Sequence, residues 1–200
     1  MSNVITEFES RVMLTENEYF EIVSFYLKQY PNIQFLQNTN IYLDTEDLFL
    51  RKKHITLRIR TINDANCELT CKIKGGNGDQ EINDNLFVKE IDMLLNHYVF
   101  PNGNVKNFLI SLARPLSEYR PITTLYNRRL EIKYPDHLLV IDKNAYGDIV
   151  DYNLEIESEN DINVSRKYLK AYCEKFNLSL KDQPYIGKAT RAIMAAKKDS

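Results

Sequence analysis

The chain has 200 residues, 44% of them hydrophobic, which suits one globular domain over residues 1–200 with a sizeable core. Its 26 basic and 28 acidic residues nearly cancel, so bulk charge excludes general binding to nucleic acids or membrane surfaces. No apolar run approaches the ~20 residues of a membrane span, and the amino terminus lacks the pattern of a signal peptide. We therefore expect a cytoplasmic protein with no membrane partner and no specific nucleic acid.

Alternation of apolar and polar residues, which is typical of β-strands, runs through most of the chain. It predicts eight strands, at residues 4–13, 34–45, 54–62, 66–74, 85–93, 122–134, 137–145 and 148–158. The segment KGGNGDQEIND, residues 74–84, has the composition of a turn-rich loop. Eight strands are enough to close a barrel.

Four helices are predicted between and after these strands. The segment 15–31 begins with Thr15 and Glu18 as a capping box, carries apolar residues at helical spacing and stops at Pro31. The other helices are expected at 105–113, at 161–176 and from about Lys188. Amphipathic helices of this kind cover the outside of a sheet.

The cysteines predict packing rather than a metal site or a disulfide framework. Cys67, Cys71 and Cys173 form no C-x-x-C pair and have no histidine at zinc-finger spacing. We expect all three to be reduced.

Charged residues are sorted by sign along the polar face of the predicted strands. Arg58 and Arg60 lie two residues apart on one strand, and Lys72 and Lys74 lie two residues apart on the next, with apolar residues between them. On a single strand, such a face is expected to lie in water. Several strands with like-sorted charges differ from ordinary solvated faces, in which the signs are mixed. A face rich in Arg and Lys is suited to bind phosphate.

Two acidic pairs lie near opposite ends of the chain. Glu7 and Glu9 are two residues apart, and so are Glu155 and Glu157, so the members of each pair lie on the same face of a strand. Side chains at i and i+2 of one strand face are roughly 7 Å apart, so each pair repels itself unless a cation is bound. Clusters of carboxylate oxygens favour a hard cation, Mg²⁺ or Mn²⁺. Together with the basic strands, they predict a site for a metal-bound polyphosphate.

The stretch Glu7-Phe8-Glu9-Ser10-Arg11 resembles the E-x-E-x-K signature of the CYTH superfamily, the triphosphate tunnel metalloenzymes. These include class IV adenylate cyclases, thiamine triphosphatases and inorganic triphosphatases. The resemblance covers nearly the whole chain and continues, in the family's order, through NIYLDTEDLFLRKKHITLRIR, ELTCK, RRLEI, LLVIDKNAYGD, YNLEIE and GKATRA.

The resemblance implies an α+β fold, an eight-stranded antiparallel β-barrel that forms a tunnel, with charged side chains inside and helices packed outside. It implies that Mg²⁺ or Mn²⁺ is held by Glu7, Glu9, Asp142, Glu155 and Glu157. It implies that a small triphosphate or polyphosphate is bound by Arg58, Arg60, Lys72, Arg129, Lys188 and Arg191. Glu90 is expected to be a further inward carboxylate, whereas Phe8 and Val12 are expected to pack outward.

Arg11 stands where the signature has a lysine. Because arginine stays charged at any working pH, Arg11 can bind phosphate or hold Glu9 but cannot accept a proton. We group it with Glu7 and Glu9 as the catalytic residues. Other polar residues are expected to serve turns, packing or the surface: Tyr42, Asp44, Thr45, Lys74, Arg128, Lys133 and Lys143.

The function expected from these residues is a metal-dependent triphosphatase that hydrolyses a phosphoanhydride of inorganic triphosphate, thiamine triphosphate or a nucleoside triphosphate. One alternative is a class IV adenylate cyclase, which forms cyclic AMP from ATP and needs an adenine pocket. The other is a non-catalytic module that binds polyphosphate or nucleotide. Both acidic pairs are intact, which favours catalysis.

Overall fold

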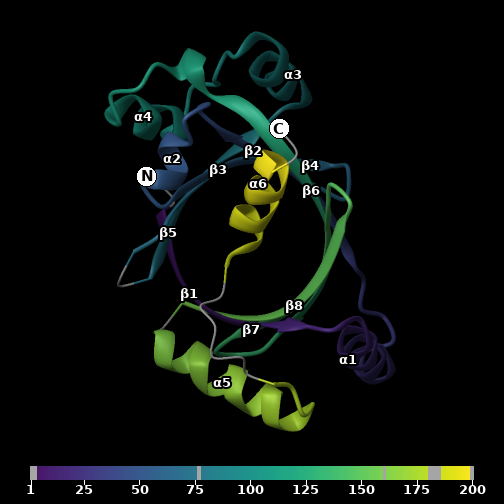
Figure 1. Ribbon diagram of the computed structural model, residues 1–200. Helices are drawn as coiled ribbons and strands as arrows, with labels where there is room; N and C mark the ends of the chain where they lie inside the picture. The colour runs from purple at the N-terminus through teal and green to yellow at the C-terminus, as the bar shows by residue number, and fades with distance from the viewer. Residues whose placement is uncertain (1–3, 76–77, 160, 180–185, 199–200) are drawn as a thin grey trace.

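Eight antiparallel strands form a closed barrel in the computed structural model, which describes residues 4–75, 78–159, 161–179 and 186–198 (Figure 1). Their order around the barrel is β1-β5-β4-β3-β2-β6-β7-β8. The predicted barrel is confirmed. The strands are β1 (Val4–Leu14), β2 (Leu36–Asp44), β3 (Ile55–Ile62), β4 (Asn66–Ile73), β5 (Asp79–Leu86), β6 (Arg120–Lys133), β7 (Leu138–Tyr146) and β8 (Ile149–Ser158).

The helices are α1 (Glu16–Gln29), α2 (Phe49–Lys52), α3 (Val88–His97), α4 (Asn104–Ser111), α5 (Ile162–Lys175) and α6 (Lys188–Lys198), with a 3₁₀ turn η1 (Leu116–Glu118). The predicted capping box of α1 is present, because Thr15 accepts from the N–H of Glu18 and Glu18 accepts from the N–H of Thr15. Among the described helices, none has the length and apolar character to cross a membrane.

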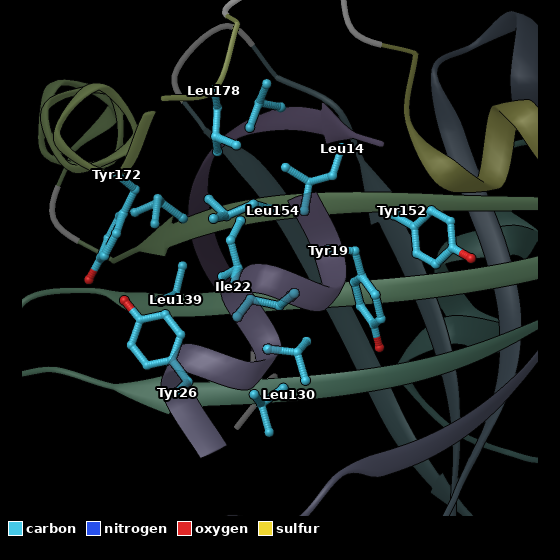
Figure 2. Packing of buried hydrophobic residues seen from close by; sticks show 14 of the residues in the cluster. Leu14, Tyr19, Ile22, Tyr26, Leu130, Leu139, Tyr152, Leu154, Tyr172 and Leu178 are labelled. Atoms are coloured by element: carbon cyan, nitrogen blue, oxygen red, sulfur yellow. The ribbon is translucent and has the colours of Figure 1, made fainter. Parts of the chain in front are cut away.

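The outward phase of the strands packs under the helices in two apolar clusters. One lies between α1, α5 and the strands β1, β6, β7 and β8, where Ile22, Tyr26, Leu139 and Leu154 are fully buried (Figure 2). The other lies under α2, α3 and α4 and takes in Leu57, Ile59, Leu69 and Cys71, among others. The apolar core therefore surrounds the barrel, and the interior is left to polar side chains.

Helix α6 is the exception, because it packs on inward-facing residues. Its Ala192 and Ile193 are buried in a cluster with Tyr42 of β2, Leu125 of β6 and Tyr146 of β7. Figure 1 shows α6 within the ring of strands. The helix thus fills part of the barrel and brings its first residues to the interior.

One predicted strand is wrong. Residues 85–93 were expected to be extended, but β5 occupies 79–86, where a loop was predicted, and α3 follows from Val88. The predicted inward carboxylate Glu90 is also wrong, because it lies in α3 and accepts the N–H of Phe87 at 2.8 Å. Helix α3 forms because Glu90 satisfies its first turn and Ile91, Leu94 and Leu95 lie on one helical face against the core.

Candidate active site

A cavity inside the barrel is lined mainly by charged side chains. Seven are basic and six are acidic, from six strands and the start of α6: Arg11, Arg58, Arg60, Lys72, Lys74, Arg129 and Lys188, and Glu7, Glu9, Asp79, Glu81, Glu155 and Glu157. This set includes all the predicted site residues except Asp142 and Arg191. Successive side chains of a strand point to opposite faces, so when one phase is buried under the helices, the other phase points into the tunnel.

The two acidic pairs converge although they are far apart in the sequence. Strand β1 lies beside β8, with Glu9 directly opposite Glu157 and Arg11 opposite Glu155. Directly opposite residues have Cβ atoms about 5 Å apart. Glu7 faces Asp79 of β5 across the other edge of β1. The carboxylates therefore form one acidic region on the wall made by β1, β5 and β8.

Lys72 lies among four of these carboxylates. Its Nζ atom contacts Glu9 and lies 3.1 Å from Glu7, 3.3 Å from Glu81 and 3.7 Å from Asp79. This contact offsets the repulsion between Glu7 and Glu9. Burial raises the pKa of Glu81, but the charges of Arg58 and Lys72 outweigh it and lower the pKa to about 2.

Arg11 compensates the carboxylates on the other side. It pairs with Glu9 and lies 3.6 Å from Glu155. Within the described ranges, no three carboxylate, imidazole or thiol groups are placed to hold a metal ion as they stand. In this arrangement, basic side chains occupy the positions between the carboxylates.

Glu155 suits a bound cation because one of its oxygens has only a longer ion pair, 3.6 Å to Arg11. It is 1% exposed, and its Oε1 atom accepts no hydrogen bond within the described part of the chain, although it lines the cavity. Burial raises the pKa of Glu157, and the neighbouring charges of Glu155 and Glu7 act in the same direction against Arg129. A divalent cation would relieve both effects, so Glu7, Glu9, Glu155 and Glu157 suit Mg²⁺ or Mn²⁺.

Guanidinium groups form the basic wall. Arg58 and Arg60 project from β3, where Arg60 donates to Asn40 at 2.9 Å and lies 3.6 Å from Glu68. Burial, then the charges of Arg58 and Arg129, lower the pKa of Arg60 to about 10. The positive charges of these residues repel one another, and a bound anion such as phosphate would relieve this repulsion.

Asp142 is held by two basic residues instead of lining the cavity. Arg129 donates to its two oxygens at 2.8 and 2.9 Å, and Lys188 donates at 2.6 Å. It is fully buried, which raises its pKa, but Arg129 and Lys188 lower the pKa by more. Asp142 points to the same face of the sheet as Arg129, but it does not line the cavity and instead positions two of the basic side chains that do.

Arg191 lies further along α6, where it pairs with Asp151 of β8 at 2.7 and 2.9 Å. Asp151 also accepts from Asn144, which belongs to a chain of inward-facing amides: Asn38, Asn127, Asn144 and Asn153, one each from β2, β6, β7 and β8. Arg191 thus contacts this amide layer. The structure does not bring it to the cavity with the other predicted phosphate-binding residues.

Several residues of the cavity wall were not predicted as site residues, among them three charged residues and a tyrosine. Asp79 and Glu81 were assigned to a loop, although their spacing of two is the same signal that identified Glu7 and Glu9. Tyr42 lines the cavity and is 1% exposed, in the inward phase of β2. Lys74 was assigned to the surface, and it lines the cavity at the end of β4.

The contacts of Glu155 predict a pH-dependent stability. Burial raises its pKa, whereas Lys188 and Arg11 lower it to about 2, below the ordinary 4.3 or so of glutamate. The charge therefore stabilises the fold above about pH 4, and this contribution disappears as the pH falls towards 2. Wild type should exceed Glu155→Gln in free energy of unfolding by up to about 3 kcal/mol at pH 5. Urea denaturation of the metal-free proteins should show this difference vanishing near pH 2.

Comparisons with known proteins agree with this geometry. The CYTH domain matches residues 6–182 of the chain. The Bacillus subtilis protein named "Putative triphosphatase YjbK" is 30% identical over 172 residues, which cover 86% of this chain and 87% of that protein.

Solved structures share the fold. The crystal structure of a protein from Bacillus halodurans, described as a "putative adenylate cyclase", has a TM-score of 0.83 and 26% identity, and covers 94% of this chain and 97% of that chain. A Hippeastrum protein titled a "putative adenylyl cyclase" with "a dominant triphophatase activity" has a TM-score of 0.75 and 15% identity, and covers 98% and 96% of the two chains. With the matched domain, the close relative and the charged tunnel in agreement, the chain belongs to the CYTH domain family.

Proposed function

We propose that the protein is a divalent-metal-dependent hydrolase that cleaves a phosphoanhydride bond of a small triphosphate inside the barrel. The observation that carries the proposal is the balance of charge on the cavity wall, with seven basic and six acidic side chains. A bare triphosphate, with roughly four negative charges, would leave this enclosed space strongly negative. The same anion with divalent cations keeps the tunnel near neutrality, and the two signs of the wall match the two components.

The basic residues would bind and orient the phosphates. Arg58 and Arg60 on β3 and Arg129 on β6 present guanidinium groups that can each bind two phosphate oxygens. Asp142 holds Arg129 through both carboxylate oxygens, so the guanidinium plane is fixed before the substrate arrives. Positioning and charge stabilisation of this kind supply most of the rate in phosphoryl transfer.

The acidic residues would hold the metal. When bound, Mg²⁺ or Mn²⁺ would neutralise phosphate charge and promote attack by water. Glu7, Glu9, Glu155 and Glu157 would supply the oxygens, and Lys72 and Arg11 would exchange their carboxylate partners for phosphate oxygens. These two residues hold Glu9 in the present structure, and each can reach more than one partner.

The names of the relatives support chemistry on a triphosphate, and they leave adenylate cyclase activity as the alternative to hydrolysis. YjbK is named a putative triphosphatase, and the Bacillus halodurans protein is named a putative adenylate cyclase. The Hippeastrum protein is named a putative adenylyl cyclase and described as having a dominant triphosphatase activity. A cyclase would use the same phosphate-binding wall, with a ribose hydroxyl as the attacking group. Inorganic triphosphate, thiamine triphosphate and nucleoside triphosphates are the candidate substrates for the hydrolase.

Incubation of the purified protein with each candidate triphosphate should release orthophosphate with Mg²⁺ or Mn²⁺ and release none with EDTA. The metal dependence follows from the carboxylate wall, which lacks its partner cation when the chelator is present. Orthophosphate, pyrophosphate and cyclic AMP should be measured separately. Pyrophosphate with cyclic AMP from ATP would identify a cyclase, and binding without any product would identify a non-catalytic module. Turnover that persists in EDTA would contradict the metal site.

A further inference from the structure

We propose that Lys74 contacts the substrate and binds the phosphate group nearest the tunnel mouth, an inference that rests on the proposed triphosphatase function. Lys74 directly follows β4, and its backbone N–H donates to the carbonyl of His54 at 3.0 Å. Its side chain lines the tunnel cavity, in the same phase of the chain as Lys72. Strand β4 therefore brings two successive lysines to the phosphate path.

Lys74 differs from the other basic residues of the wall in its ion pairs. The six others each have a carboxylate oxygen within 4.0 Å: Arg11, Arg58, Arg60, Lys72, Arg129 and Lys188. Nζ of Lys74 has no carboxylate within that distance in the described part of the chain. Within the described residues, six of the seven basic groups have a carboxylate ion pair, and Lys74 is the one that can take an anion from outside without giving up such a pair.

The surroundings of Lys74 also favour an anion. Nζ of Lys74 and Nη1 of Arg11 both lie beside the backbone of Gly187. A Cβ atom added to Gly187 would be 3.8 Å from the first and 3.6 Å from the second, so the two cationic groups lie near each other. Burial, and next the charge of Arg11, lower the pKa of Lys74, while Asp79 opposes this change and Lys72 reinforces it. A phosphate oxygen near both cations would reverse the repulsion between them.

The position of Lys74 indicates which phosphate it would bind. A groove between β1 and α5 opens from the tunnel and shares part of its lining: Glu7, Glu9, Arg11, Lys74 and Asp79. Arg166 of α5 lines this groove but not the tunnel. Lys74 stands where the two spaces join. A linear triphosphate held by Arg58, Arg60 and Arg129 would therefore meet Lys74 with its outermost phosphate.

Replacing Lys74 by glutamine should weaken binding of a non-hydrolysable, methylene-bridged triphosphate about tenfold, the equivalent of about 1.4 kcal/mol. Titration calorimetry with Mg²⁺ measures this affinity without turnover. Lys74→Arg should keep most of the affinity, because the positive charge remains. Arg166→Gln is the matched control, since it removes one charge from the same groove without reaching the tunnel. In assays with inorganic triphosphate, Lys74→Gln should raise KM about tenfold and change kcat less than about twofold.

Unchanged affinity for the analogue in Lys74→Gln would show that Lys74 does not contact the substrate. An equal loss of affinity in Arg166→Gln would show that Lys74 acts only through general electrostatic attraction, which also overturns the proposal. Thermal melts of both variants check that they are folded. The proposed function fails separately. A wild type that neither hydrolyses a triphosphate nor binds the analogue would refute the triphosphatase, whereas an active wild type matched by Lys74→Gln would refute only the role of Lys74.

Discussion

Replacing Glu9 by glutamine is expected to reduce triphosphate turnover about a hundredfold or more while leaving the barrel folded. The amide keeps the shape of the side chain but removes the charge that would bind the metal ion, and loss of one such group has an effect of this size. The fold should tolerate the change because Lys72 keeps Glu7, Glu81 and Asp79 as partners. Steady-state kinetics and thermal melts measure the two effects.

Ligand-induced stabilisation provides the control for Glu9→Gln. Wild type should melt at a higher temperature with Mg²⁺ and the methylene-bridged analogue, because a ligand that binds only the folded form stabilises it. The variant should gain much less. Glu68→Gln is a matched comparison: its carboxylate lies 3.6 Å from Arg60 but does not line the cavity. Equal gains in wild type and Glu9→Gln would refute Glu9 as a metal ligand.

Replacing Asp142 by asparagine is expected to destabilise the protein by about 3 kcal/mol or more, the second large effect. The change leaves Arg129 and Lys188 buried without their shared carboxylate, and breaking a buried ion pair in this way has costs of this order. Urea denaturation measures the loss. Asp47→Asn is the control, because Asp47 pairs with Arg114 at 2.9 Å on the surface, where the loss of an ion pair should change stability far less.

The same variant separates two roles for Asp142. A positioning role predicts that Asp142→Asn loses stability and phosphate affinity, while the Mg²⁺ concentration that gives half-maximal activity stays the same. A role as metal ligand, which the sequence predicted, requires the opposite: little change in melting temperature and a large increase in that Mg²⁺ concentration. Activity titrations with Mg²⁺ on wild type and variant distinguish the two results.

Seven of the eight strands could be predicted because one phase of each is apolar and packs under helices. Strand β5 lacks this signal. Its inward residues Asp79 and Glu81 face the tunnel, while outward Asp84 accepts from the first N–H groups of α4 at 3.0 and 2.8 Å. The outward phase is only half apolar, with Ile82 and Leu86 in the core, and the glycines before β5 favoured a loop. The next segment has enough alternation to resemble a strand, although its capping and helical spacing determine α3.

The charged wall was predictable from alternation, but the partners of each charge were not. Asp142 and Glu155 are both carboxylates of the inward phase, and both contact Arg129 and Lys188. Only Glu155 lines the cavity, where its second oxygen lies 3.6 Å from Arg11. Lys74 resembles a surface lysine because two glycines follow it in the sequence, as at the end of a strand. Such differences arise from side chains that are distant in the sequence, so they become visible only when the barrel is closed.

The way β1 closes the barrel has a consequence for folding kinetics. Strand β1 pairs with β8 over seven residue pairs, from Phe8 to Leu14, but with β5 over only four, from Val4 to Glu7. Neither partner is its neighbour in the sequence, whereas most other pairs are hairpins. Such non-local pairing makes closure a slow step that follows hairpin formation. The short β1–β5 seam should also exchange its amide hydrogens before the rest of the barrel, so that local opening begins beside Glu7.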